Sequence, residues 1–164
     1  MLKRDGKEPS RSAGGKEPMK IHQLSLFLEN KPGRLSALCQ ALADEGINIL
    51  THSLADTAQF GILRLIVRNW EKAKAGLERI GAVVDVTEVV AVEVADRPGG
   101  LAELLAILER AGVNIEYMYA FTFRRGDKAA MIFRFEDPDA AIAALQAKGV
   151  NVIGGVELFE RAES

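Results

Sequence analysis

Two short segments carry the residues best suited to hold a small polar ligand. "NKPGRL" (30–35) and "DRPGGL" (96–101) each place a polar residue, a basic residue and Pro-Gly directly before a helical apolar pattern. A strand that enters a helix through glycine leaves the first helix amides unpaired at the positive end of the helix dipole. Such an end binds carboxylates and phosphates. The segments therefore predict anion-binding loops, and the structural alternative is a plain turn.

An asparagine follows each segment at the same distance. Asn48 and Asn114 stand where a strand-like run begins, with apolar residues on either side. Asparagine is depleted in strands, yet its side chain offers both hydrogen-bond donors and acceptors. The alternative is a turn asparagine that bonds its own backbone. Because an asparagine follows both Pro-Gly segments at the same distance, a binding role is favoured.

The two segments belong to a longer repeat. With an offset of 66 residues, Pro32 matches Pro98, Gly33 matches Gly99, Leu35 matches Leu101, Gly46 matches Gly112 and Asn48 matches Asn114. Further along, the offset becomes 68, so the second copy has two more residues than the first, near "RRGDK" (124–128). Insertions in surface turns cost little, so we expect a hairpin tip there. The constant offset indicates an internal duplication.

Each copy predicts the order strand, helix, strand, strand, helix, strand. Apolar residues alternate over 21–28 and 89–94, as in half-buried strands. Each first helix carries an apolar stripe and ends at a glycine, Gly46 or Gly112. Strands follow over 47–55 and 60–67, then 113–123 and 129–135; helices over 71–81 and 138–149; and final strands over 83–89 and 150–159.

This order is typical of the ferredoxin-like class, an α+β fold with an antiparallel sheet and both helices on one face. Each unit has about 70 residues, which gives only a modest core. Residues 83–94 must hold the last strand of one unit and the first of the next, so no linker separates them. We expect a tail at 1–18, units at 19–88 and 89–160, and packing of the two units as a pseudo-dimer.

Composition and charge exclude several classes of function. A formal net charge of −2 indicates no broad attraction to nucleic acid or to a membrane surface. No apolar run approaches the roughly 20 residues of a membrane span. Cys39 is the only cysteine, which excludes a disulfide framework within the chain and fits a reducing cytoplasm. Residues 1–18 lack an apolar stretch, which predicts a disordered tail and no secretory signal; a basic arm for an anionic partner is the alternative.

Neither catalysis nor RNA binding is indicated by the residues. His22 and His52 are the only histidines and have no carboxylate or thiol at metal-ligand spacing. No nucleophile or phosphate-loop motif occurs, so we expect no catalytic residue, no metal and no cofactor. A ferredoxin-like RNA-binding module needs basic charge and stacking aromatics on its central strands. The matching positions here are Ser25, Phe27, Ala91 and Glu93.

"ENKPGRLSALCQALADEGINI" and "ADRPGGLAELLAILERAGVNI" closely resemble the ACT domain, a small amino-acid-binding regulatory module of the ferredoxin-like class. The resemblance covers residues 19–160 as two modules, and the combination of Pro-Gly-x-Leu with Gly-x-Asn-Ile is specific. It implies a non-catalytic amino-acid-binding sensor. The alternative is a regulatory subunit for a biosynthetic enzyme, as in acetolactate synthase; the second Pro-Gly-x-Leu unit favours a true tandem.

The resemblance also implies a site. ACT modules pair side by side, and the ligand at their interface contacts the first strand–helix loop and the start of the second strand, so a homodimer is possible. In the regulatory domain of phosphoglycerate dehydrogenase, two asparagines hold the effector; the matching residues are Asn30 and Asn48, and in the second unit Asp96 and Asn114. The full implied set is Asn30, Lys31, Pro32, Gly33, Arg34, Leu35, Asn48, Ile49, Asp96, Arg97, Pro98, Gly99, Gly100, Leu101, Asn114 and Ile115.

Departures from that pattern predict two unequal sites. That dehydrogenase domain has a histidine where Leu28 and Val94 stand here, so the effector's identity does not carry over. Asp96 can pair with a ligand ammonium, whereas Asn30 offers a neutral contact.

Other expectations concern the carboxylate of the ligand and two aromatic residues. Arg34 can reach a carboxylate and Gly100 cannot. The amides of residues 33, 34, 99 and 100 are expected to bind the α-carboxylate. Tyr117 and Tyr119 either line a pocket or simply pack on their strand.

Overall fold

The computed structural model describes residues 18–56 and 59–163. The tail expected at 1–18 therefore lies, apart from Pro18, outside the described residues. The elements in chain order are β1 (Lys20–Glu29), α1 (Arg34–Asp44), β2 (Ile49–Asp56), β3 (Phe60–Val67), α2 (Trp70–Arg79), β4 (Val84–Ala95), α3 (Gly100–Arg110), β5 (Ile115–Arg125), β6 (Lys128–Phe135), α4 (Pro138–Ala147), β7 (Val152–Ile153) and α5 (Gly155–Glu163). Within the described ranges, no helix has the length and apolar character of a membrane span.

All strands join one antiparallel sheet with the order β2-β3-β1-β4-β6-β5, and β7 pairs with β4. The first unit contributes β2-β3-β1-β4, and the second contributes β7-β4-β6-β5, the ferredoxin-like order in both cases. β4 serves both units: its residues 84–90 pair with β1 and its residues 90–95 pair with β6. The expected boundary between residues 88 and 89 falls inside this strand. The prediction of two linked ferredoxin-like units is confirmed.

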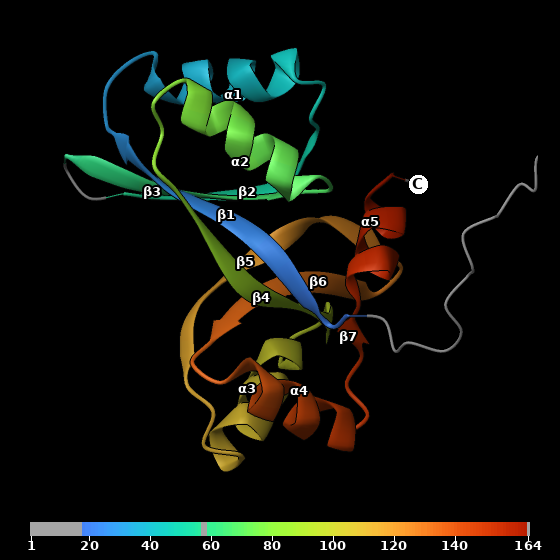
Figure 1. The fold of residues 1–164 in the computed structure, drawn as a ribbon. Coiled ribbons are helices and arrows are strands. Elements are labelled where there is room, and N and C mark those ends of the chain that lie inside the picture. The colour runs from blue at the N-terminus through green and yellow to red at the C-terminus, as the bar shows by residue number, and fades with distance from the viewer. Residues whose placement is uncertain (1–17, 57–58, 164) are drawn as a thin grey trace, which may run out of the picture.

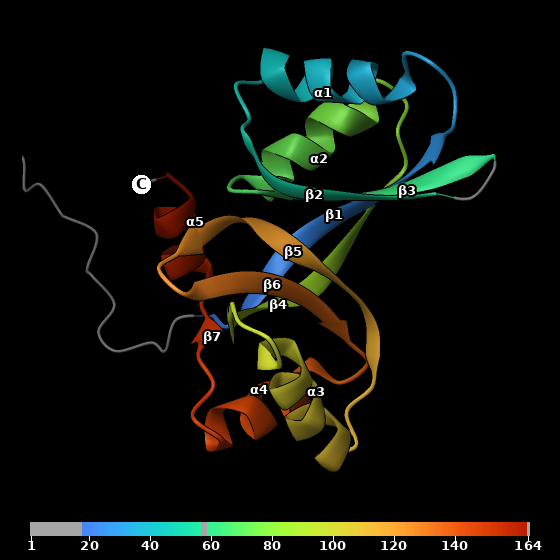
Figure 2. The same cartoon turned by 180° about the vertical axis from the view of Figure 1, so that it is seen from behind.

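The helices of the two units lie on the outside of the molecule. Helices α1 and α2 cover one end of the coiled sheet, and α3 and α4 cover the other (Figure 1). The view from behind shows the same layering, with the helix-free faces of the strands turned toward each other between them (Figure 2). Three apolar clusters follow from this arrangement: one under each helix pair and one between the helix-free faces.

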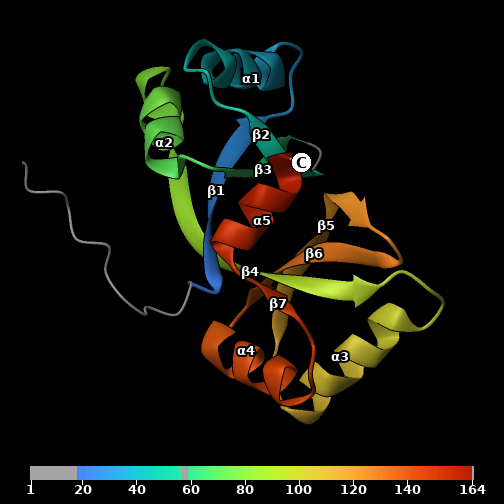
Figure 3. The ribbon, with the colours of Figure 1, turned by 90° about the vertical axis from the view of Figure 1, so that its right-hand side faces the viewer.

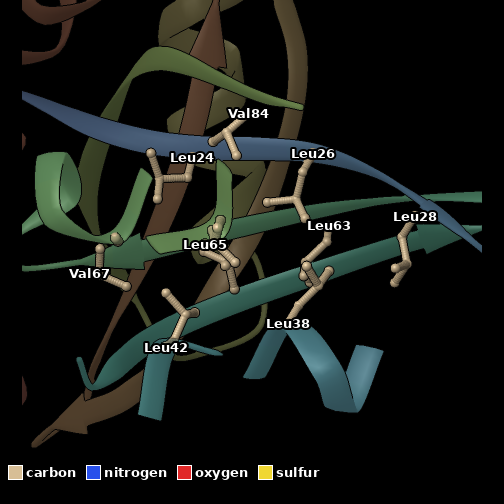
Figure 4. Packing of buried hydrophobic residues seen from close by; sticks show 11 residues of the cluster. Leu24, Leu26, Leu28, Leu38, Leu42, Leu63, Leu65, Val67 and Val84 are labelled. Carbon is tan, nitrogen blue, oxygen red and sulfur yellow. The ribbon is translucent and has the colours of Figure 1, made fainter. Parts of the chain in front are cut away.

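The period-two pattern of β1 divides its side chains between two of these clusters. Leu24, Leu26 and Leu28 are buried toward α1, where Leu38 and Leu42 meet them (Figure 4). Each fully buried leucine contributes roughly 1.5–3 kcal/mol to folding. On the other side of the strand, Ile21 belongs to the cluster between the helix-free faces. The expected alternation is thus confirmed.

The predicted strand at 150–159 is wrong over most of its length. β7 has only two residues, and α5 follows from Gly155 to Glu163, beside the inner cluster (Figure 3). Gly154 and Gly155 interrupt the strand, because glycine adds conformational freedom and no side-chain contact to a sheet. Leu158 is fully buried in the inner cluster, with Phe159 and Ala162 half-buried against it. Burial of this helical stripe fixes the end of the chain as a helix.

The predicted turns have the expected backbone. Gly46 and Gly112 end α1 and α3 with φ values of 66° and 67°, in the left-handed region where glycine carries no steric penalty. The two-residue turn of Gly126 and Asp127 joins β5 to β6. This hairpin tip lies where the second copy is longer than the first, as the change of offset predicts.

Candidate ligand-binding loops

The two Pro-Gly loops have the same backbone conformation. Gly33 has φ 86° and ψ −18°, and Gly99 has φ 85° and ψ −14°. Both are left-handed, a conformation that disfavours residues with a Cβ. Each is the N-cap of an eleven-residue helix, and as a glycine it supplies no side-chain hydrogen bond to the first helix amides. The duplication has therefore preserved an uncapped helix start in both units.

The amides at the helix starts differ in one respect from the expectation. The Arg34 amide donates to the Lys31 carbonyl at 3.3 Å, and the Gly100 amide donates to the Arg97 carbonyl at 3.0 Å. These two amides close the turn instead of facing a ligand. The first amide bonded to the Gly33 carbonyl is that of Ala37, at 3.0 Å. By helix geometry, residues 35 and 36, and likewise 101 and 102, are the next amides available at each helix end.

Side chains around the first loop form a small charged cluster. The Glu29 carboxylate accepts hydrogen bonds from Lys31 at 3.2 Å and from Arg34 at 3.1 and 2.8 Å. The Lys31 ammonium, followed by the Arg34 guanidinium, lowers the pKa of the Glu29 carboxyl below its ordinary value. The backbone N–H of Asn30 donates to the Gln59 carbonyl at 3.1 Å. The Asn30 side chain takes no part in this bond and is exposed.

A cavity of about 200 Å³ lies beside this first loop. Its lining consists of Leu28, Glu29, Asn30, Lys31, Leu35, Leu54 and Gly61. Leu35 and Leu54 are large apolar residues with 38% and 48% of their surface exposed. The site therefore combines a polar rim with an apolar wall. All of the lining comes from the first unit.

The second loop is held by different contacts. Arg97 donates two hydrogen bonds to the Glu103 carboxylate, at 2.9 and 2.7 Å. The Asp96 amide donates to the Asp127 carbonyl at 2.8 Å, which ties the loop to the hairpin tip. A Cβ at Gly100 would overlap the carbonyl oxygen of Ala95, so glycine is required there by close backbone approach.

A cavity of about 330 Å³ lies beside α3 in the second unit. It is lined by Glu93, Val94, Ala95, Gly100, Glu103, Leu104, Ile107, Lys128, Lys148, Gly149, Val150 and Asn151. Asp96 is not part of this lining. Two lysines and two glutamates contribute to the lining, all of which belongs to the second unit. The two loops thus face cavities of different chemistry.

The fold does not bring the paired polar residues together within a unit. Asn30 precedes α1, whereas Asn48 follows its C-terminal end, and eleven helical residues span about 16 Å. Asp96 and Asn114 are separated in the same way by α3. Ile49 and Ile115 are half-buried under the helices. A small ligand therefore cannot touch both members of a pair within one unit.

A polar cluster between the helix-free faces was missed by sequence reasoning. The Gln23 side chain is fully buried; it donates to the Tyr117 hydroxyl and accepts from the Tyr119 hydroxyl, both at 2.7 Å. Burial raises the pKa of Tyr119 above its ordinary value. The Arg64 guanidinium lies over the Tyr117 ring, 3.8 Å from the centroid. The sequence signal that could have predicted this cluster is Gln23 itself, a polar residue on the same face of β1 as the buried Ile21.

No metal-ligand cluster of three or more His, Cys, Asp or Glu side chains is present in the part of the chain that the structure describes. Exposed His22 lies against the ring of Trp70, with centroids 4.7 Å apart. The His22 ring therefore packs against an aromatic neighbour.

Comparison with known proteins identifies a family and two proteins of similar structure. The family model for an ACT domain pair matches residues 19–161. A protein of known crystal structure from Bacteroides thetaiotaomicron is 39% identical, covering 87% of this chain and 97% of its own, with a TM-score of 0.80. The regulatory subunit of aspartate kinase from Thermus thermophilus is 20% identical, covering 83% of this chain and 98% of its own, with a TM-score of 0.59; at this identity the likeness concerns the fold. No curated protein matches the sequence.

Proposed function

Because the chain belongs to the ACT domain family, as an ACT domain pair, we propose that it is an amino-acid-binding regulatory or sensor protein without chemistry of its own. The observation that carries this proposal is the first Pro-Gly loop. There, an uncapped helix start, an exposed asparagine and an apolar wall meet at one cavity. A free amino acid has three groups that match these three features.

The ligand's orientation follows from the charges of the loop. Its α-carboxylate binds the helix amides of residues 35 and 36, where the helix dipole is positive. Its α-ammonium contacts the carbonyl oxygen of the Asn30 side chain. Its side chain lies against Leu35 and Leu54, whose exposed surfaces form the apolar wall. An aliphatic amino acid fits this wall best, since burial of apolar surface is favourable.

A second copy of the chain would complete this site. Asn48 lies at the far end of α1 from Asn30, so it reaches a ligand only across a side-by-side contact between units of two molecules. β2 is an edge strand of the sheet, with unpaired backbone groups available for such a contact. The family resemblance implies this mode of pairing. The proposal therefore includes a homodimer with two equivalent first-unit sites.

The second loop is expected to bind the ammonium group of a ligand more strongly than the first. Asp96 takes the position of Asn30 and supplies a carboxylate in place of an amide oxygen. Charge-assisted hydrogen bonds are roughly twice as strong as neutral ones. No guanidinium stands at the first helical position, because Gly100 replaces Arg34. Binding at the two loops is therefore expected to differ in affinity and in the amino acid preferred.

A thermal-shift screen against the twenty amino acids tests the proposal. A ligand present at a hundredfold excess over its Kd stabilises the folded protein by about 2.7 kcal/mol, which raises Tm on the order of 5–10 °C. Nucleotides and sugar phosphates, which lack an ammonium, should have much smaller effects. If ten millimolar of every amino acid leaves Tm unchanged, or a nucleotide raises it further, the proposed function is wrong.

A matched pair of variants assigns the binding to the loop. Gly33→Asp puts a carboxylate at the helix start, and Gly46→Asp makes the same change at the other end of α1, again at positive φ and without a close contact. We expect Gly33→Asp to weaken binding tenfold to a hundredfold, as the loss of a charge-assisted hydrogen bond would. Gly46→Asp should bind normally. Calorimetric titration of both variants measures the difference.

The second candidate function is that of a regulatory subunit for a biosynthetic enzyme. It is favoured by the fold shared over nearly the full length of the aspartate kinase regulatory subunit from Thermus thermophilus. A pulldown from native extract distinguishes this function from a free-standing sensor. Stoichiometric recovery of one biosynthetic enzyme, whose activity then responds to the amino acid found in the screen, would support the subunit role. Recovery of no enzyme would favour the sensor.

A further inference from the structure

A cavity of about 300 Å³ opens between the helix-free faces of the two units. It is lined by Ser25, Leu26, Phe27, Ile62, Arg64, Asp85 and Thr87 from the first unit and by Glu116, Tyr117 and Arg134 from the second. Both units therefore line this cavity, whereas each cavity at a Pro-Gly loop is lined by a single unit. It shares no lining residue with the first-loop cavity.

The inward side chains of β1 change from apolar to polar toward this cavity. Ile21 is buried in the inner cluster, Gln23 is buried and hydrogen-bonded, and Ser25 is half-buried. Phe27 is 68% exposed at the mouth. The space between the faces is thus closed by apolar packing near α5 and open to solvent at the other end of β1.

Arg64 is one side chain of this cavity with unused bonding capacity. Its Nε is shielded from solvent and has no hydrogen-bond partner among the described residues. The guanidinium lies on the ring of Tyr117, 3.8 Å from the centroid. Arg134, by contrast, donates to the Glu116 carboxylate at 3.2 Å and to the Glu88 carbonyl at 2.9 Å. A half-buried guanidinium that stacks on a ring keeps its N–H donors in a planar fork, which matches the geometry of a carboxylate.

The position of Arg64 is fixed by the polar cluster behind it. The Tyr117 hydroxyl accepts a hydrogen bond from Gln23, and Gln23 accepts one from Tyr119. Gln23 comes from the first unit and both tyrosines come from the second. These bonds hold the aromatic platform in one orientation, so Arg64 loses little additional freedom when it binds a ligand.

We infer that this cavity is a second ligand site, which binds the carboxylate of a small organic molecule through Arg64. The planar guanidinium matches a carboxylate in a two-bond arrangement. Phe27 and Ile62 provide an apolar surface for the rest of the molecule. Asp85, across the cavity, disfavours a second carboxylate and can accept from an ammonium. The ligand is thus a monocarboxylate with an apolar tail, either an amino acid or an organic acid without an ammonium.

Titration of ¹⁵N-labelled protein followed by NMR tests the inference directly. The probes are acetate, leucine and 4-methyl-2-oxopentanoate; the last two share a carboxylate and a branched tail and differ at the α position. We expect a saturable shift of the Arg64 Nε–Hε signal. The signal of Arg110, exposed on α3, serves as the internal control and should show only a small, linear change. A response to leucine alone identifies an amino acid as the ligand; an equal or larger response to the oxo acid identifies an organic acid.

Variants separate this site from the Pro-Gly loops. Arg64→Gln should weaken binding of the active probe about tenfold or more, as the loss of a charge-assisted hydrogen bond would. Gly33→Asp should leave the Arg64 response intact, which makes failure here distinct from failure of the proposed function. If Arg64→Gln does not fold, Arg64→Lys takes its place in the test. It keeps the positive charge but lacks the planar guanidinium, so binding of the active probe should again be weakened. No saturable Arg64 shift with any probe at 50 mM, or the same affinity in the folded Arg64 variant, would overturn the inference.

Discussion

The two Pro-Gly loops share a backbone and differ in almost every contact of their side chains. The φ and ψ values of Gly33 and Gly99 agree within a few degrees. In the first loop, Glu29 draws together two basic side chains; in the second, Ala95 takes its place and Arg97 turns to Glu103 instead. Backbone geometry is thus maintained by glycine, while the chemistry offered to a ligand has diverged.

The difference also concerns the freedom of each loop. The first loop tolerates a large side chain at its first helical position, where Arg34 projects to solvent. The second allows none, because Gly100 lies against the Ala95 carbonyl. The second loop is therefore the more constrained of the two, and the first is better able to adjust around a ligand.

The largest expected effect comes from a methyl group at the constrained position. Gly100→Ala would force the helix start away from Ala95, which should lower the free energy of unfolding by about 3 kcal/mol or more. Arg34→Ala, the matched change in the first loop, removes only exposed contacts and should alter stability by less than about 1 kcal/mol. Urea denaturation of both variants measures the contrast. Equal stabilities would mean that the two loops are equally tolerant.

An exchange of the ammonium-binding residues should shift affinity between the loops. Asn30→Asp adds a carboxylate to the first site, and we expect it to raise amino-acid affinity about tenfold through a charge-assisted hydrogen bond. Asp96→Asn makes the opposite change at the second site and should lower affinity there. Calorimetry on the two single variants and the double variant gives the comparison. Unchanged affinities in all three would show that residues 30 and 96 do not contact the ligand.

The smallest expected effect is a pH response of the Glu29 contacts in the first loop. The folded-state pKa of Glu29 is lowered by Lys31 and Arg34, so its contacts are present at and above its ordinary pKa of 4.5. They are lost as the pH falls below that value through the folded pKa. Ala95 provides no titrating group at the matching place. NMR titration should place the Glu29 midpoint below 4.5, and Lys31→Ala should move it upward; a midpoint unaffected by Lys31→Ala would contradict the assignment.

Sequence patterns predicted the parts of this fold that depend on local rules. Pro32, Gly33 and their copies specify the helix starts, and Gly46 and Gly112 specify the helix ends, because positive φ favours glycine strongly. The apolar alternation over 21–28 identified β1 as a half-buried strand. These features are read from a few adjacent residues, so a single sequence suffices to find them.

The remainder depends on contacts between distant segments. The end of the chain resembles a strand in its apolar content, yet the space beside the inner cluster accommodates a helix, and Leu158 fills it. Gln23 and Arg64 are unremarkable in sequence and become neighbours of Tyr117 only when the sheet coils. The separation of Asn30 from Asn48 likewise follows from the length of α1 and not from either motif.

The continuous strand β4 has a mechanical consequence. Val90 pairs with Lys20 on one side and with Phe133 on the other, so a single residue belongs to the hydrogen-bond ladders of both units. Neither unit can rotate about its own axis without changing the twist of this strand, and that torsion reaches the other unit through bonded backbone rather than through a hinge. A disturbance at one Pro-Gly loop can therefore reach the other along the whole length of this continuous strand, from Val84 to Ala95.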